Sequence, residues 1–278
     1  MQVFGSRLER AIVEIQIQGV KSRIDTLHRA GGRAPLVFLH GFGSTKEDYA
    51  DAALHPVLAD YRILAFDAPG FGGSTCSDAS ALSMEYLVAV VEAVCDHFEI
   101  GSFHLCGHSM GGLAAVLLAH TRPVQILSLV NIEGNLVSED CFLSRQILES
   151  GEGDSAAFLD RLRERIWRVP QAGFPLYAAG LTGKTAGDAV RPILRSMVFH
   201  SDHSSLMEKF LSIPCPKMFM HGEQNRGLPY LGQLRAGGVA VAEISHAGHF
   251  PMYSNPQETL SRMAGFLDQI DRTDGGTS

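Results

Sequence analysis

Ser109 lies in a pattern whose residue types and spacing suit nucleophilic catalysis. The stretch Gly107-His108-Ser109-Met110-Gly111 has a glycine two residues before and two residues after the serine. Where a strand passes into a helix through so tight a turn, the serine backbone is strained and side chains at the glycine positions would collide. The Met110 amide at the helix N-terminus can then stabilise an oxyanion. The pattern predicts a nucleophilic serine.

Such a serine needs a general base, and histidine is the side chain suited to that task. Among twelve histidines, His249 follows the last predicted strand, which fits the chain order of serine, acid and histidine known for this motif. His246 is the nearest alternative, but its place between strand and loop favours a structural role. A second oxyanion donor is expected from the Phe42 amide, because His40-Gly41-Phe42-Gly43 ends an earlier strand.

The elements that must position these residues can be predicted from apolar periodicity and turn formers. Predicted strands cover residues 11–18, 22–27, 36–42, 62–66, 102–109, 125–132, 217–221 and 239–244. Predicted helices cover residues 46–59, 83–98, 110–120, 155–167, 187–199, 230–235 and 256–270. The first two strands alternate as an antiparallel hairpin would. We therefore expect an α/β fold with a doubly wound, mostly parallel eight-stranded sheet and a site at the carboxyl ends of its strands.

The alternation of strands and helices breaks in the middle of the chain. Residues 134–213 contain helical segments and no convincing strand, which predicts an inserted helical cap. The core that carries the sheet is then expected from residues 1–133 and 214–272. Residues 273–278 are rich in small and polar side chains and are expected to form a disordered tail.

Composition narrows the classes of partner. The net charge is −7 over 278 residues, without a dense basic run, which disfavours nucleic acid and anionic membranes as partners and favours a small molecule. Signal-peptide and membrane-spanning patterns are not found, so a cytoplasmic protein is expected.

The cysteines and histidines give no sign of a bound metal or cofactor. Five irregularly spaced cysteines favour reduced thiols over disulfides or a zinc site. His200 and His203 have no carboxylate or cysteine cluster beside them to complete a metal site. Because a phosphate-binding glycine loop is also missing, no cofactor is expected. The oligomeric state cannot be inferred from the sequence.

Four motifs occur in the order seen in the α/β-hydrolase superfamily, and the chain resembles that superfamily over about residues 36–270. They are His40-Gly41-Phe42-Gly43, Asp67-Ala68-Pro69-Gly70-Phe71-Gly72-Gly73-Ser74, Gly107 to Gly112, and Gly248-His249-Phe250. The resemblance implies a serine hydrolase or esterase-like enzyme. It also implies that Asp67 is structural and hydrogen-bonds its own loop.

The sequence departs from its relatives at the third member of the triad. Most relatives have an aspartate after the seventh strand, where this chain has Asn225. Glu133 follows the sixth strand, where haloalkane dehalogenases carry their acid, and a buried carboxylate there needs a partner such as His249. We expect Glu133 to be the acid, and Glu223 or a dyad supported by Asn225 remains open. Alternatively, Glu133 pairs with Arg145 of the cap.

The predicted reaction is acyl transfer to water through a Ser109 acyl-enzyme, with carboxylic esters as default substrates. Thioesters, lactones, amides and carbon–carbon bonds remain open, because the same apparatus serves them all. A hormone-receptor role, or a cofactor-free dioxygenase or lyase, is the alternative. Large apolar cap residues predict an apolar acyl or aromatic substrate, although most of them could serve packing. They are Phe142, Leu143, Phe158, Trp167, Phe174, Leu176, Tyr177 and Phe199.

Overall fold

The structure is a computed structural model that describes residues 7–149 and 155–274. Within these residues a nine-stranded sheet has the order β1-β2-β4-β3-β6-β7-β8-β9, with β5 paired to β2. The strands are β1 (Glu9–Ile17), β2 (Val20–Arg29), β3 (Arg33–Leu39), β4 (Tyr61–Phe66), β5 (Thr75–Cys76), β6 (Phe103–His108), β7 (Ile126–Ile132), β8 (Lys217–Gly222) and β9 (Ala240–Ile244). The predicted α/β fold is confirmed, and the two-residue β5 is the strand that apolar periodicity missed.

Strand direction changes at the hairpin end of the sheet. β1 pairs with β2, and β2 with β4, in antiparallel fashion, whereas the pairs from β4 through β3 to β9 are parallel. Gln18 and Gly19 form the β1–β2 turn with φ of 51° and 86°, and two positive φ values suit the twist of a two-residue hairpin loop. The parallel strands all end at one edge, which is where the sequence places its chemical residues.

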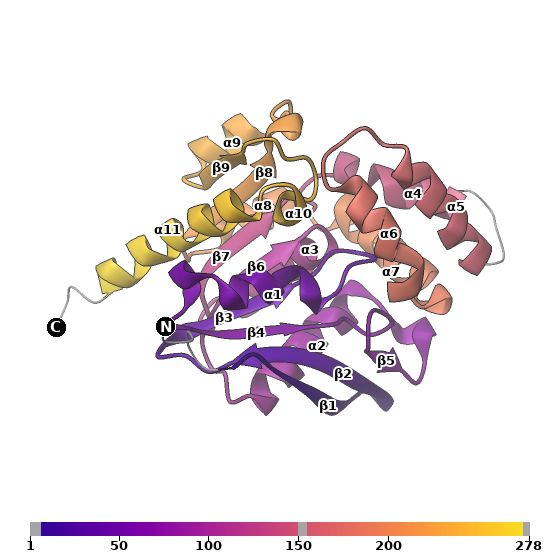
Figure 1. Ribbon diagram of the computed structural model, residues 1–278, viewed down its shortest axis with the longest axis horizontal. Helices are drawn as coiled ribbons and strands as arrows, with labels where there is room; N and C mark the ends of the chain where they lie inside the picture. The colour runs from indigo at the N-terminus through magenta and orange to yellow at the C-terminus, as the bar shows by residue number, and fades with distance from the viewer. Residues whose placement is uncertain (1–6, 150–154, 275–278) are drawn as a thin grey trace.

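Helices cover both faces of the sheet, as Figure 1 shows. One apolar cluster packs α2 and α3 on one face, and a second packs α1 and α11 on the other. The helices outside the insertion are α1 (Ala50–Leu54), α2 (Met84–His97), α3 (Met110–Thr121), α9 (Leu231–Ala236), α10 (Pro251–Ser254) and α11 (Pro256–Asp274). β6 is buried at every position, as expected for a central parallel strand with helices on both sides.

Two predicted elements differ from the structure. The single helix expected over residues 46–59 is wrong, because this segment forms the 3-10 turns Lys46–Tyr49 and Pro56–Leu58 around the short α1. His55 is extended, with ψ of 131°, because the ring of the following Pro56 disfavours helical geometry at the residue before it. The disordered tail expected over residues 273–278 is wrong at its first two positions, since α11 continues to Asp274; residues 275–278 lie outside the described residues.

Helices fill the described part of the insertion between β7 and β8. They are α4 (Phe142–Glu149), α5 (Ser155–Trp167), α6 (Phe174–Lys184), α7 (Gly187–His203) and α8 (Leu206–Ser212). In Figure 1, α4 to α7 gather beyond one end of the sheet, whereas α8 packs against α3. A division into core and cap at residues 134 and 213 remains our proposal.

Candidate active site

Ser109 occupies the sharp turn that the glycine spacing predicted, between β6 and α3. Its φ of 51° and ψ of −115° are strained for a residue with a side chain. A Cβ atom at Gly107 would lie 2.3 Å from the Gly111 carbonyl oxygen, and one at Gly111 would lie 2.2 Å from the Leu39 carbonyl oxygen. These contacts require glycine at both positions, and the turn presents Ser109 at the carboxyl edge of the sheet.

Glu133 and His249 meet at the same edge although 116 residues separate them. His249 Nδ1 lies 2.8 Å from Glu133 Oε2. Glu133 directly follows β7, which is the sixth strand of the predicted sheet because the short β5 was not foreseen. Its side chain is 6% exposed, whereas that of His249 is 31% exposed and borders a cavity. Because this contact holds Nδ1 of His249 against the carboxylate, the other ring nitrogen, Nε2, stays available to interact with a different group.

The alternative partners considered for this site lie elsewhere or act differently. Asn225 Nδ2 donates to Glu133 Oε1 at 2.9 Å and to Oε2 at 2.7 Å, so it contacts the carboxylate and does not take its place. Glu223 accepts the His246 amide at 2.8 Å and pairs with Arg226. Arg145 of the insertion pairs with Asp202 instead of Glu133.

The loop of residues 40–43 lies against the serine turn, and we call it the oxyanion loop after the donor predicted at Phe42. A Cβ atom at Gly41 would lie 2.6 Å from His108 Nδ1 and 3.2 Å from Ser109 Cβ, so a larger residue there would push the loop away. Phe42 borders the same cavity as Ser109. Tyr177 of α6 donates from its hydroxyl to the Phe42 carbonyl at 2.8 Å, which ties the insertion to this loop. Met110 begins α3, so its amide is one of the free donors at that helix N-terminus.

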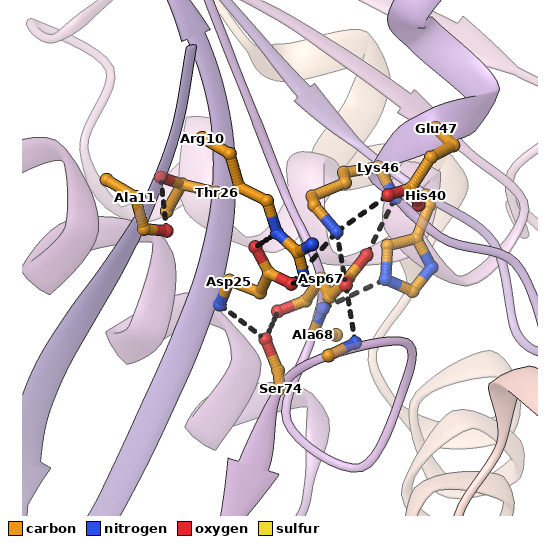
Figure 2. A network of polar contacts seen from close by, with 11 residues as sticks. Arg10, Ala11, Asp25, Thr26, His40, Lys46, Glu47, Asp67, Ala68 and Ser74 are labelled. Atoms are coloured by element: carbon orange, nitrogen blue, oxygen red, sulfur yellow. Dashed lines mark hydrogen bonds and ion pairs between the residues drawn. The ribbon is translucent and has the colours of Figure 1, made fainter.

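A network of buried charged side chains surrounds Lys46, which follows the oxyanion loop in the chain (Figure 2). Lys46 Nζ lies 2.9 Å from Asp67 Oδ2 and 3.2 Å from Asp25 Oδ2, and both carboxylates are fully buried. Although burial by itself lowers the pKa of Lys46, its hydrogen bonds to Glu47 and Asp67 raise it overall. Arg10 donates to Asp25 from the hairpin, and the net effect of these cations is a lowered pKa for Asp25 despite its burial.

Asp67 also holds its own loop, and the loop holds His40. Asp67 Oδ2 accepts the Gly73 amide at 2.8 Å, and the Asp67 carbonyl accepts the Ser74 hydroxyl at 2.7 Å. His40 Nε2 accepts the Ala68 amide at 2.9 Å, while its Nδ1 donates to the Gly41 carbonyl at 2.7 Å. The contacts of Asp67 therefore match the structural role that the family resemblance implied.

His108, next to the serine, is buried and connects the turn to the loop that carries His249. Its Nε2 donates to the His249 carbonyl at 2.8 Å, which places the lone pair on Nδ1. Burial, together with the nearby His249, lowers the pKa of His108 well below its ordinary value. The ring is therefore neutral at physiological pH. The sequence motif identified this position, but nothing in it revealed the bond to residue 249.

One cavity of about 370 Å³ borders Ser109, Glu133 and His249. Most of its lining is apolar and comes from the helical insertion, including Phe142, Leu143, Phe174 and Tyr177 from the set of residues that the sequence highlighted. Phe158 packs in the core instead, while Trp167, Leu176 and Phe199 are exposed, and Phe142 is also largely exposed although it borders the cavity. Asp140 also lines the cavity, and burial raises its pKa. This arrangement can enclose an apolar group beside a nucleophile.

The cysteines and His200 were considered above for disulfide bonds or metal binding. All five cysteines are free thiols. His200 bonds to Glu85 at 2.7 Å and to Ser204 at 2.7 Å. Across residues 7–149 and 155–274, no three histidine, cysteine or acidic side chains gather in a way that could hold a metal ion. No helix in this part of the chain is both long enough and apolar enough to cross a membrane.

Known proteins resemble both the sequence and the fold. The chain spans 26% of the length of an acetyltransferase component of an acetoin cleaving system from Pseudomonas putida, with 39% identity over 102 residues. A pimeloyl-[acyl-carrier protein] methyl ester esterase of Aeromonas hydrophila is 33% identical over 246 residues, which is 88% of this chain and 81% of the relative.

A solved carboxylesterase structure from Nitrososphaera gargenis superposes with a TM-score of 0.76 at 14% identity and covers 94% of this chain and 100% of the other, a likeness of fold alone. Residues 36–262 match the sequence family described as the alpha/beta hydrolase family. Since this match covers most of the chain and all four motifs, the protein belongs to the alpha/beta hydrolase family.

Proposed function

We propose that this protein is a serine hydrolase that cleaves carboxylic esters or related acyl bonds through an acyl-enzyme on Ser109. The observation that carries the proposal is the meeting of Ser109 and His249 at one cavity, with Nδ1 of His249 held 2.8 Å from Glu133. This is the arrangement of nucleophile, base and orienting acid that serine hydrolases on unrelated folds share.

In the proposed reaction, Ser109 Oγ attacks the carbonyl carbon of the substrate while His249 Nε2 takes the hydroxyl proton. The Phe42 and Met110 amides donate to the oxygen that becomes negative. Collapse of this intermediate breaks the ester bond, and His249 returns the proton to the departing alcohol. Water then attacks the acyl-enzyme with the same base, which releases the acid and restores Ser109. Glu133 stabilises the imidazolium in both steps.

The cavity supports an apolar acyl chain as the group that is bound. Its walls are mainly aliphatic and aromatic, so each buried methylene contributes about 0.8 kcal/mol to binding. With p-nitrophenyl esters of increasing chain length, kcat/KM should rise about fourfold per methylene until the 370 Å³ are filled. The Aeromonas relative is named for hydrolysing a methyl ester of an acyl chain, which belongs to the same substrate class.

A fluorophosphonate probe followed by intact-mass analysis and peptide mapping tests the nucleophile. We expect one adduct, on Ser109, formed roughly 10³-fold more slowly in Glu133→Gln, because the imidazolium loses its charged partner. Glu223→Gln is the matched control, since Glu223 contacts His246 and Arg226 and not the triad. It should react at the wild-type rate.

Two results would favour the alternative functions. A folded protein without an adduct on Ser109 would support a dioxygenase or lyase that uses His249 alone. An adduct on Ser109 combined with negligible ester turnover, and a ligand-dependent rise in the melting temperature, would support a receptor.

A further inference from the structure

Glu133 lies in a strained turn that needs support from its neighbours. Its φ of 46° is in the left-handed region, which residues with a side chain seldom adopt. Asn131, two residues earlier on β7, is fully buried, and its Oδ1 accepts the Gly134 amide at 2.6 Å. This hydrogen bond closes the turn around Glu133. It therefore holds the backbone from which the carboxylate leaves the end of the strand.

The same turn packs against the helix that begins beside the nucleophile. A Cβ atom at Gly134 would lie 2.6 Å from Gly112 Cα, and one at Gly112 would lie 3.0 Å from Asn131 Oδ1. Close approach of two backbones of this kind requires glycine. The Ser109 amide also donates to the Ile132 carbonyl of β7 at 3.0 Å. The turn that carries Glu133 and the turn that carries the serine are therefore held at a fixed spacing.

The other polar atom of the Asn131 side chain has no protein partner. Within residues 7–149 and 155–274, its Nδ2 is buried and donates no hydrogen bond. A buried donor without a partner destabilises a fold, so stability alone does not account for an asparagine at this position. The bond from Oδ1 to the turn does account for it, because an apolar side chain offers no acceptor to the Gly134 amide.

Resting on the proposed function, we propose that Asn131 is a positioning residue for the acid of the site. It keeps Glu133 in the strained conformation that places Oε2 2.8 Å from His249 Nδ1. Asn131 is not among the residues that border the cavity, so it acts through Glu133 and not on the substrate. Without the Asn131 oxygen, the turn relaxes and the carboxylate moves. A displacement of about 1 Å in such a group lowers the rate up to about 100-fold.

Asn131→Ala tests this role, with Ser128→Ala as the matched control. Ser128 is also fully buried on β7, and its hydroxyl lies 2.8 Å from His104 Nδ1, so each variant loses one buried hydrogen bond from the same strand. We expect Asn131→Ala to lower kcat for a short p-nitrophenyl ester about 10-fold to 100-fold, with KM changed less than about twofold. Fluorophosphonate labelling of Ser109 should slow by the same factor. Ser128→Ala should keep the wild-type rates, and equal rates in the two variants overturn the proposal.

A double-mutant cycle with Glu133→Gln tests whether Asn131 acts through the acid. In the Glu133→Gln background, Asn131→Ala should slow labelling less than about threefold, because the charge that Asn131 positions is already gone. A loss as large as in the wild-type background would show that Asn131 acts on the serine turn or on the fold in general. That result would overturn the assignment to Glu133.

Gly134→Ala tests the spacing without removing a hydrogen-bonding group. The added Cβ meets Gly112 Cα at 2.6 Å and must push the two turns apart. Labelling should slow at least about tenfold, and wild-type labelling would contradict the fixed spacing. Gly101→Ala is the control, because a Cβ atom there meets nothing within 4 Å. Melting temperatures identify any variant that fails to fold, and if Asn131→Ala is one, Gly134→Ala carries the test.

A readout independent of turnover distinguishes failure of this inference from failure of the proposed function. The Nδ1 proton of His249, when bonded to a carboxylate, gives a low-field proton NMR signal. We expect the signal in wild type and in Ser128→Ala, and its shift or loss in Asn131→Ala. If wild type shows the signal but Ser109 is never labelled, the proposed function fails while the positioning is still tested. An unchanged signal in Asn131→Ala contradicts the positioning.

Discussion

The cluster around Lys46 and the cluster around Glu133 both bury carboxylates, but they compensate the negative charge differently. Asp25 and Asp67 are fully buried against Lys46, and Arg10 completes the pairing (Figure 2). Around Glu133, the described donors are two neutral groups and one histidine. Histidine gains and loses a proton near neutral pH, whereas lysine and arginine stay charged.

This difference indicates what each cluster does. Lys46 is 2% exposed and its partners lie on β2, on the loop after β4 and in its own turn, so the charges join segments of the fold. His249 is 31% exposed at a cavity, so its ring can reach a bound molecule. Permanent compensation stabilises the structure, while a histidine beside a cavity is a side chain that can accept and donate a proton in a reaction.

The largest expected effect comes from removing the permanent compensation. Lys46→Met leaves the two buried carboxylates without their shared cation, and we expect the free energy of unfolding to fall by about 3–5 kcal/mol. Urea unfolding followed by circular dichroism measures the loss. Labelling of Ser109 in the fraction that remains folded should stay near the wild-type rate. A variant of wild-type stability with slow labelling would place Lys46 in the reaction and remove the distinction between the clusters.

The pH dependence of stability gives the next effect, through His108. Because burial lowers the pKa of His108, the unfolded chain binds a proton below pH 6.5 that the folded protein does not. Stability is therefore lost as the pH falls below 6.5, with a slope of up to about 1.4 kcal/mol per pH unit. His108→Asn should remove this slope below pH 6.5. Parallel curves for the two proteins would show that His108 does not titrate on unfolding.

A smaller effect is expected where the insertion meets the oxyanion loop. Tyr177→Phe removes one hydrogen bond to the Phe42 carbonyl but keeps the ring stacked on Phe250. We expect kcat to fall about threefold to tenfold with little change in KM, because one neutral hydrogen bond contributes about 0.5–1.5 kcal/mol. Steady-state kinetics with a short ester measures the split. A rise in KM alone would assign Tyr177 to substrate binding.

The smallest expected effect comes from an ion pair that lies outside both clusters. Arg145 pairs with Asp202 at the surface of the insertion, and its bond lowers the pKa of Asp202 to about 2. Exposed pairs contribute about 1 kcal/mol or less, so Arg145→Ala should change stability only slightly and labelling by less than about twofold. A large loss of labelling would indicate that Arg145 reaches Glu133 after all.

The turn that carries Ser109 could be predicted because its geometry depends only on residues within two positions of the serine. A glycine two residues either side of Ser109 is a requirement of one turn, and that turn has the geometry expected. Glu133 was expected to be the acid because it follows the strand after which haloalkane dehalogenases carry theirs and because a buried carboxylate needs a partner, and its role stays a prediction. The helix expected over residues 46–59 failed because the effect of Pro56 on His55 outweighed the apolar pattern.

Contacts between distant segments had no such signal. The sequence showed Asn225 where an acid was expected, but its role as a donor to Glu133 depends on β7 and β8 lying side by side. The sequence did not single out Lys46, and only the approach of the hairpin and the loop after β4 buries it.

By itself, the sequence determined the family, the serine turn and the order of the chemical groups, because these depend on residues within a few positions of one another. The tertiary structure decided which groups pair, because hydrogen bonds and charge compensation depend on distances that chain separation does not encode. His249 and Glu133 are 116 residues apart in the chain, yet His249 Nδ1 lies 2.8 Å from Glu133 Oε2. The buried surroundings that make such a pairing strong arise only when the sheet is assembled.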